Sequence, residues 1–408
     1  MNNMQESTGK KHIGEKFWVS PYNDESILDR SIRLPEKISI HDVTLRDGEQ
    51  TPGIVFNKQD KIDISQKLSD AGVQRIEVGM PVISAEEKDA IKTITSMGLK
   101  SKIFTLCRLI KKDIDESASV GIDGIVLETP LGVPKRKQLG WDIEKALSVT
   151  QEMIDHAKSY GLFVSSFGVD TTRADIKDVM DFASLAQNSK VDSLSIVDTF
   201  GCISYEGMGY LVDKIRSVFK RPLEVHTHND FGLAVAVSFA AVVHGASTVH
   251  VAVNGIGERT GNASLDEIHM GLKYLYHLDS GLKEEKLVEL SRLVEERSKF
   301  RTPDNKPFVG RRAFGRESGI SVAGWANYNL GSEPVLPDLV GNRHEVVIGK
   351  KSGKGSIRYK LLELRMAKGD VPEEKLEKIV EAVKDISQKE KRPIPDDEFR
   401  KIAEKILK

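Results

Sequence analysis

Two histidines separated by one residue are the strongest candidates for chemistry in this chain of 408 residues. His226 and His228 lie at the carboxyl end of an apolar run, in the sequence His-Thr-His-Asn-Asp. Alternate side chains of a β-strand point to the same face, so both imidazoles face one side. Two neighbouring imidazoles are common ligands of a divalent metal. Taken alone, the motif is equally typical of two buried histidines that hydrogen-bond to their neighbours.

Three polar residues near other strand ends strengthen the metal interpretation. Asp47 follows the first apolar run, and Asn262 follows the eighth. In a closed barrel the seventh, eighth and first strands are neighbours, so a carboxylate, two imidazoles and an amide oxygen converge. Ligation by oxygen and nitrogen without thiolate suits Mg, Mn, Co or Zn and leaves positions for substrate. Arg46 then stabilises a developing oxyanion beside the metal, or else forms an ordinary salt bridge.

Three further features each have two interpretations. Thr199 either offers a hydroxyl to a substrate carboxylate or caps a loop. Glu258 is either an acid/base or a residue that orients Arg259. The segment Gly349–Gly355 places lysines among glycines, which suits a phosphate or a solvated turn, and it lacks the residue order of a P-loop.

Eight short β-rich runs alternate with longer helical patterns, which indicates parallel strands joined by crossover helices. Glycines after several helical patterns mark their carboxyl ends. The predicted strands are Ile38–Val43, Val73–Gly79, Lys102–Cys107, Gly124–Glu128, Leu162–Phe167, Ser193–Asp198, Leu223–His228 and Thr248–Val253. The predicted helices between them include Lys58–Ala71, Ala85–Met97, Asp142–Tyr160, Ile176–Gln187, Tyr205–Phe219 and Leu233–His244.

The predicted fold class is α/β, a (β/α)8 TIM barrel followed by a smaller helical C-terminal region. A doubly wound open sheet is the second possibility, but no phosphate-binding glycine fingerprint follows the first strand. The expected organisation is an N-terminal extension (1–35), a catalytic TIM-barrel domain (36–280) and a helical C-terminal region (281–408). That last region contains helical patterns at Lys283–Ser298, Ser356–Ala367 and Glu373–Lys384.

Composition excludes several classes of protein. The chain carries 60 Lys and Arg against 61 Asp and Glu, so no global field attracts nucleic acid or an anionic membrane. Two cysteines cannot form a disulfide framework and suggest a reducing compartment. Residues 1–16 lack an apolar signal segment, and no apolar run is long enough to span a membrane. We therefore expect a cytoplasmic protein without nucleic-acid or membrane partners.

Three motifs resemble those of one enzyme family. They are Thr-Leu-Arg-Asp-Gly-Glu-Gln at 44–50, His-Thr-His-Asn-Asp-Phe-Gly at 226–232, and the glycine-rich run at 254–263. In this order and on these strands they resemble the metal-dependent Claisen-condensing barrel enzymes, which include the 2-isopropylmalate, homocitrate and citramalate synthases. The hydroxymethylglutaryl-CoA lyases are more distant members. The resemblance covers roughly residues 36–365.

The resemblance implies a role for each matching residue. Asp47, His226 and His228 would bind the divalent metal, with Asn262 at or near the ligand set. Arg46 would contact the keto or enolate oxygen of the substrate, and Gln50 and Arg173 would support the substrate site. The implied reaction joins the methyl carbon of acetyl-CoA to a metal-bound 2-oxo acid, and thioester hydrolysis then releases CoA.

The chain departs from the family where the acid/base residues are expected. Arg316 and Ser321 occupy the two histidine positions of a His-Glu-x-Gly-Ile-His motif that follows the barrel in the synthases. Glu258, Glu317, Tyr328 and His344 are the candidate replacements. A Glu-Asp pair before Arg173 is replaced by Val-Asp-Thr-Thr, and Thr-Pro-Leu-Gly at 129–132 replaces a Thr-Ser-x-x-His stretch.

We expect an acyltransferase of the 2-isopropylmalate synthase type, active in leucine or related amino-acid biosynthesis. Ser165 stands where homocitrate-type enzymes carry an arginine for a distal carboxylate, which favours a small or branched 2-oxo acid. Homocitrate or citramalate synthase specificity, a lyase that runs the reverse cleavage, and a non-catalytic barrel retained as an interaction subunit are the alternatives. The resemblance also implies a homodimer formed through the C-terminal region.

Overall fold

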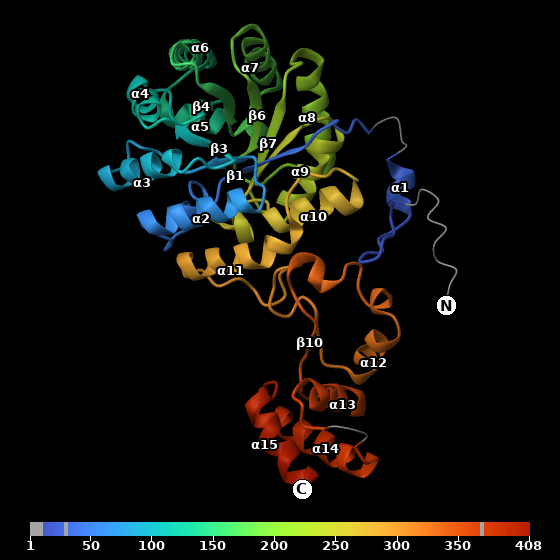
Figure 1. Ribbon diagram of the computed structural model, residues 1–408. Helices are drawn as coiled ribbons and strands as arrows, with labels where there is room; N and C mark the ends of the chain where they lie inside the picture. Colours follow the sequence, from blue (N-terminus) through green and yellow to red (C-terminus); the bar gives the residue numbers. More distant parts are fainter. Residues whose placement is uncertain (1–10, 28–31, 368–370) are drawn as a thin grey trace. The chain divides into compact units, whose positions relative to one another are not determined.

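The computed structural model describes residues 11–27, 32–367 and 371–408, which divide into two compact units (Figure 1). The barrel unit spans Tyr22–Arg301, and the C-terminal unit joins residues 11–21 to Thr302–Lys408. The barrel unit therefore includes a helix, Leu287–Ser298, that the sequence analysis grouped with residues 281–408. Part of the expected N-terminal extension, residues 1–10 and 28–31, lies outside the described residues.

Eight parallel strands form a closed barrel in sequence order, as the alternation predicts. The strand β1 pairs with β8 as well as with β2, which excludes the open sheet and makes the first and last strands neighbours. The strands are β1 (Ser39–Asp42), β2 (Arg75–Glu77), β3 (Lys102–Cys107), β4 (Gly124–Pro130), β5 (Phe163–Val169), β6 (Ser193–Asp198), β7 (Leu223–Thr227) and β8 (Thr248–Val251).

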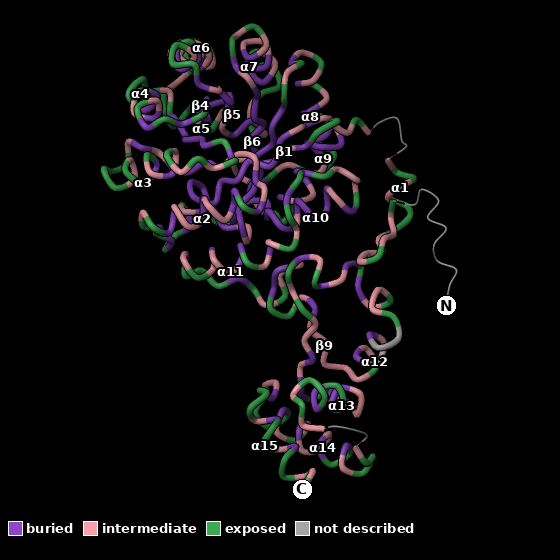
Figure 2. Tube along the Cα trace, viewed as in Figure 1, coloured by how far each residue is buried: buried purple, intermediate pink, exposed green. Residues whose placement is uncertain are grey.

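Helices surround the strands, and the buried residues gather on the strands and on the helix faces toward them (Figure 2). Four helices of the barrel unit, α1, α4, α5 and α10, were not among those predicted from the sequence. The helices of the barrel unit are α1 (Tyr22–Ser26), α2 (Lys58–Asp70), α3 (Ala85–Ser96), α4 (Lys111–Ser119), α5 (Val133–Leu139), α6 (Ile143–Ser159), α7 (Ile176–Asn188), α8 (Tyr205–Val218), α9 (Ala234–Val243), α10 (Leu265–Leu275) and α11 (Leu287–Ser298).

Local sequence determines where these helices begin. Asn57 and Asp60 form a reciprocal capping box at the start of α2, in which each side chain accepts a hydrogen bond from the backbone N–H of the other. The side chains of Ser84, Asp142 and Ser204 each accept one hydrogen bond from a backbone N–H in the first turn of α3, α6 and α8. These caps satisfy N–H groups that a helix start leaves without partners.

The interior of the barrel has an apolar side and a polar side. Apolar side chains line strands β3 to β6 and the loop that follows β2. Four buried polar side chains lie on β1, β2, β7 and β8. The apolar wall consists of buried Phe104, Leu106, Val126, Phe167 and Val197 with partly buried Met80, Phe163 and Val169. The buried tetrad consists of His41, Glu77, Glu224 and His250, all fully enclosed.

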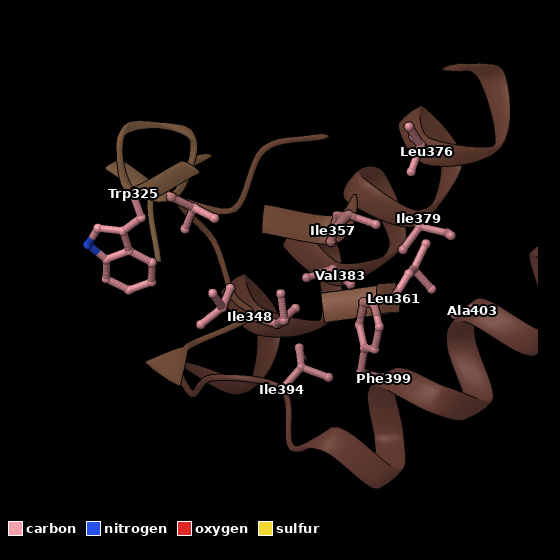
Figure 3. Packing of buried hydrophobic residues seen from close by; sticks show 12 residues of the cluster. Trp325, Ile348, Ile357, Leu361, Leu376, Ile379, Val383, Ile394, Phe399 and Ala403 are labelled. Carbon is pink, nitrogen blue, oxygen red and sulfur yellow. The ribbon is translucent and has the colours of Figure 1, made fainter. Parts of the chain in front are cut away.

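The C-terminal unit has its own apolar core. Two short parallel strands, β9 (Gly315–Arg316) and β10 (Glu345–Val346), accompany the helices α12 (Gly319–Asn327), α13 (Lys354–Glu363), α14 (Glu373–Glu390) and α15 (Asp396–Leu407). Figure 3 shows Leu361, Ile379 and Phe399 pointing toward one another between these helices. None of the helices that the structure describes is long and apolar enough to cross a membrane.

Candidate active site

A carboxylate and two imidazoles converge at the carboxyl ends of β1 and β7. The Nε2 atoms of His226 and His228 lie 3.1 Å apart, and they are 3.6 and 3.7 Å from Oδ2 of Asp47. All three side chains are buried. Most of the barrel sequence separates Asp47 from His226. The two residues lie together, as predicted, because the barrel closes between β8 and β1.

Asn262 joins this group through the loop that follows β8. A backbone bridge pairs His228 with Asn262, and the Asn262 amide Nδ2 donates to Oδ1 of Asp47 at 2.9 Å and to the Ile256 carbonyl. Its Oδ1 atom is buried without a hydrogen-bond partner among the described residues. Gly257 permits this approach, because a Cβ there would lie 2.2 Å from the Asn262 Nδ2.

The chemistry of these donors fits a divalent cation. Burial lowers the pKa values of His226 and His228, so both imidazoles are neutral near pH 7 and keep a lone pair for a ligand bond. The Asp47 carboxylate supplies the negative charge, and the orphaned Oδ1 of Asn262 is a further oxygen donor. Three converging ligand atoms with one more nearby leave coordination positions for a substrate.

Arg46 is fixed beside this group with one nitrogen unused. Its Nε donates to Oε1 of Glu77 at 2.5 Å, and its Nη1 donates to Oδ2 of Asp47 at 2.7 Å. The remaining Nη2 is buried and has no partner within the described part of the chain. Arg46 and the nearby Asp42 are both buried. A buried N–H donor without a partner costs free energy, which a hydrogen bond to a substrate oxygen would recover.

Glu77 is a site residue that the sequence analysis missed. It contacts both Arg46 and His41, and these contacts bring the pKa of Glu77 down to about 2 against the opposing effect of burial. The ring of His41 stacks on His250 at 4.2 Å, and His250 hydrogen-bonds Glu224. Because these two rings are nearly parallel, their in-plane lone pairs do not point at one common ion, and the buried tetrad is a hydrogen-bonded network.

The other predicted site residues lie around the same end of the barrel. Thr199 Oγ1 accepts a hydrogen bond from the Asp170 backbone N–H, and the Arg173 guanidinium forms two hydrogen bonds with the Asp170 carboxylate. Glu258 is half-exposed and pairs with Arg259, which supports its interpretation as an orienting residue. None of these contacts reaches the ligand atoms of Asp47, so their catalytic and substrate roles stay predictions.

A cavity of about 370 Å³ adjoins Arg46. Gln50, predicted to support the site, is exposed and lines this cavity. Apolar side chains contribute much of the rest of the lining, including the exposed Val55 and Ile83. The cavity therefore offers apolar surface next to Arg46, mixed with charged side chains such as Lys58 and Glu86.

Within the C-terminal unit the candidate bases have partners of their own. Glu317 accepts a hydrogen bond from the Lys351 backbone N–H at 2.7 Å. His344 hydrogen-bonds Glu333 and packs its ring against Trp325 at 4.2 Å. Tyr328 is exposed, with its ring edge toward Trp18. A histidine held by a carboxylate is chemically suited to proton transfer, so His344 stays among the candidates.

Comparison with known proteins identifies the class. Residues 37–294 match the family described as HMGL-like, so the chain belongs to this family. Residues 308–391 match the homocitrate synthase post-HMGL domain-like family. A hydroxymethylglutaryl-CoA lyase structure from Bacillus subtilis has the same barrel fold, with a TM-score of 0.61 and 20% identity over 67% of this chain and 97% of that one.

The more similar relatives are synthases. A homocitrate synthase of Methanothermobacter thermautotrophicus is 39% identical over 96% of this chain and 98% of its own length. A 2-isopropylmalate synthase of Methanocaldococcus jannaschii is 38% identical over 92% of this chain and 73% of its own, and a citramalate synthase of that organism is also 38% identical over 85% and 70%. The protein is accordingly an enzyme, an acyltransferase of the type that converts an acyl into an alkyl group on transfer.

Proposed function

We propose that this enzyme condenses acetyl-CoA with a 2-oxo acid whose side chain is uncharged, as a 2-isopropylmalate synthase does, with a divalent metal at Asp47, His226 and His228. The observation that carries the proposal is the unused, buried Nη2 of Arg46 beside three converging ligand atoms. A 2-oxo acid offers two adjacent oxygens for a metal and a keto oxygen for such a donor.

Each residue of the site then has a defined task. A bound divalent cation supplies Lewis-acid polarisation of the keto group. Arg46 donates a hydrogen bond from Nη2 to the keto oxygen as negative charge develops there, and Glu77 holds the guanidinium in place. Asn262 orients Asp47. The cavity beside Arg46 is proposed to take the acyl-CoA arm, since its lining offers apolar contacts to a pantetheine chain.

The apolar wall supports an uncharged acceptor. The rings of Phe167 and His226 meet edge to face with 5.3 Å between their centroids, so a substrate held at Asp47, His226 and His228 faces this wall. Ser165, at the position of a carboxylate-binding arginine in the resemblance, donates its hydroxyl hydrogen bond to Glu224 and is fully buried. The arginines at 173 and 259 are each paired with an aspartate. A branched alkyl side chain suits these surroundings better than a second carboxylate.

Homocitrate-type specificity is the second candidate. Relatives with that name are 39 and 40% identical to this chain. Lys135 in α5 is close enough to Glu128 to influence its carboxylate, and no ion pair within 4.0 Å holds the Lys135 ammonium among the described residues. A substrate with a distal carboxylate would have this cation to pair with, so the acceptor has to be tested directly.

The test measures CoA thiol release from acetyl-CoA by metal-loaded protein with pyruvate, 2-oxoisovalerate, 2-oxobutyrate or 2-oxoglutarate. We expect release that depends on both the metal and the 2-oxo acid, with 2-oxoisovalerate or another uncharged acceptor preferred. Release only with 2-oxoglutarate would establish the homocitrate alternative. If no acceptor supports release but a 3-hydroxy-3-carboxyacyl-CoA yields acetyl-CoA, the enzyme is a lyase.

We further propose a cytoplasmic homodimer with a role in leucine biosynthesis. The two free cysteines, Cys107 and Cys202, are compatible with a reducing compartment. Residues 308–391, which match the homocitrate synthase post-HMGL domain-like family, include much of the C-terminal region through which the resemblance implies dimer formation. Light scattering at micromolar concentration should give twice the mass of the chain, and the monomer mass would contradict the proposal.

A further inference from the structure

Glu128 points into the mouth of the barrel from strand β4. It follows Val126 of the apolar wall by two residues, so the two side chains share the inward face of the strand. Its partner in the strand register is Phe167, which borders His226. A carboxylate therefore lies next to the apolar wall, near enough to Arg46 and Asp47 for their charges to act on it.

The Glu128 carboxylate is not used by the fold. No hydrogen bond or ion pair engages it among the described residues, although Arg46 and Lys135 are near enough to influence it. Burial raises its pKa, and the charges of Glu77 and Asp47 add to that effect while Arg46 and Lys135 oppose it. Leaving a half-enclosed carboxylate without partners is unfavourable for stability, so a role outside folding has to account for it.

The other acidic side chains at this end of the barrel are engaged. Asp47 contacts Arg46 and Asn262, and Glu77 contacts Arg46 and His41. The carboxylates at positions 49, 170, 198, 230 and 258 likewise accept hydrogen bonds or pair with basic groups. Among these carboxylates and Glu128 itself, all from the described part of the chain, Glu128 is thus the one whose lone pairs are available to a proton of the substrate.

We propose that Glu128 is the catalytic acid/base of the condensation, an inference that rests on the proposed function. The Glu128 carboxylate accepts a proton from the methyl group of the acetyl thioester, and the electron pair of that C–H bond forms the new bond to the keto carbon. The π electrons of the keto group move to its oxygen, to which Arg46 donates. The proton then passes from Glu128 to this oxygen, so the condensation leaves Glu128 as it began, and water subsequently hydrolyses the thioester.

The position of Glu128 fits this role chemically. The proton to be removed is on carbon and weakly acidic, so a base in an enclosed, partly apolar site with few competing hydrogen bonds is effective. Glu128 also lies near Arg46, which receives the charge at the other end of the reaction.

The test compares wild-type protein with E128Q, E128D and the control E152Q, whose residue is exposed and paired with Lys111 on the surface. For E128Q we expect kcat for 2-oxo-acid-dependent CoA release to fall about 100-fold or more. The KM for the 2-oxo acid and the affinity for Mn²⁺, measured by calorimetry, should change less than threefold. E128D, which keeps the carboxylate, should recover at least tenfold over E128Q, and E152Q should match wild type.

A second readout follows the proton itself. In D2O, with acetyl-CoA and the preferred 2-oxo acid, wild-type protein should remove hydrogen from the acetyl methyl group, by exchange with solvent or by transfer during condensation. The rate of this removal should be much lower in E128Q. Undiminished kcat in E128Q, or a loss confined to KM or Mn²⁺ affinity, would overturn this inference alone. If wild-type protein releases no CoA with any 2-oxo acid, the proposed function fails and the inference fails with it.

Discussion

Arg46 is clamped by two carboxylates, and the clamp defines which of its nitrogens can meet a substrate. Lysine at this position would keep the charge but not the fork that bridges Glu77 and Asp47. We expect R46K to lower kcat/KM for CoA release about 100- to 1,000-fold, the usual cost of removing one oxyanion donor. The control is R33K, a change at an exposed surface arginine, which should leave kcat/KM within twofold. Equal activity of R46K and wild type would contradict the role of Nη2.

His41 links the site to the pH dependence of stability. Burial, with repulsion from His250, lowers the pKa of His41 from 6.5 to about 4, although Glu77 opposes the change. The unfolded chain therefore takes up a proton below pH 6.5 that the folded chain refuses until about pH 4. The contribution of His41 is complete above pH 6.5 and is lost progressively as the pH falls toward 4.

The variant H41Q removes this titration while its amide can still donate to Glu77. Between pH 7 and pH 5, the free energy of unfolding of wild type should fall by about 2 kcal/mol more than that of H41Q. Other groups, such as Asp42, whose pKa burial raises to about 7, affect both proteins and cancel in the difference. Urea unfolding at the two pH values measures it, and parallel curves for the two proteins would refute the assignment.

At the scale of elements, the loop after β8 positions Asn262 through close backbone packing. Gly261 has a φ of +90°, and a Cβ there would lie 1.9 Å from the Gly255 carbonyl oxygen. G261A should therefore displace the loop and weaken Mn²⁺ binding about 10- to 100-fold, with little change in secondary structure. The control is G140A, since Gly140 also has a positive φ but open space around its Cβ position. Calorimetric titration with Mn²⁺ compares the variants, and equal affinities would contradict the role of the loop.

The strands and most helices were predictable because buried parallel strands appear as apolar runs between amphipathic helices. The helix α4 was missed, since Ile114 is its only buried apolar residue and no helical period results. The helix α15 was hidden by its high charge, although Phe399 anchors it. Asp47 could be predicted to lie near His226 because closure of the barrel brings the ends of the first and seventh strands together.

Other parts of the site could not be read from the sequence. Glu77 and Glu224 look like ordinary polar residues of alternating strands, because their partners come from other strands and strand pairing is not visible in the local sequence. Glu128 lies at the end of a predicted strand, and an inward carboxylate there carries no local signal. Its significance comes from what it does not contact, which only three-dimensional packing shows.

At the scale of the whole molecule, the two compact units have separate cores. Phe399 is fully buried in the core of the C-terminal unit. F399A should destabilise that unit by about 3 to 5 kcal/mol, as large-to-small core changes do, without changing Mn²⁺ affinity in the barrel unit. Denaturation monitored together with Mn²⁺ titration tests this independence. A loss of Mn²⁺ affinity in folded F399A would contradict it.

The central claim is a metal-dependent condensation of acetyl-CoA with an uncharged 2-oxo acid, and product mass tests it most directly. Metal-loaded protein is incubated with acetyl-CoA and an equimolar mixture of pyruvate, 2-oxobutyrate, 2-oxoisovalerate and 2-oxoglutarate. The predicted result is free CoA and a dominant product whose mass equals that of a 2-oxo acid with an uncharged side chain plus acetate. Neither should form after the metal is removed by chelation. A dominant product from 2-oxoglutarate, or product formation that survives chelation, would contradict the account.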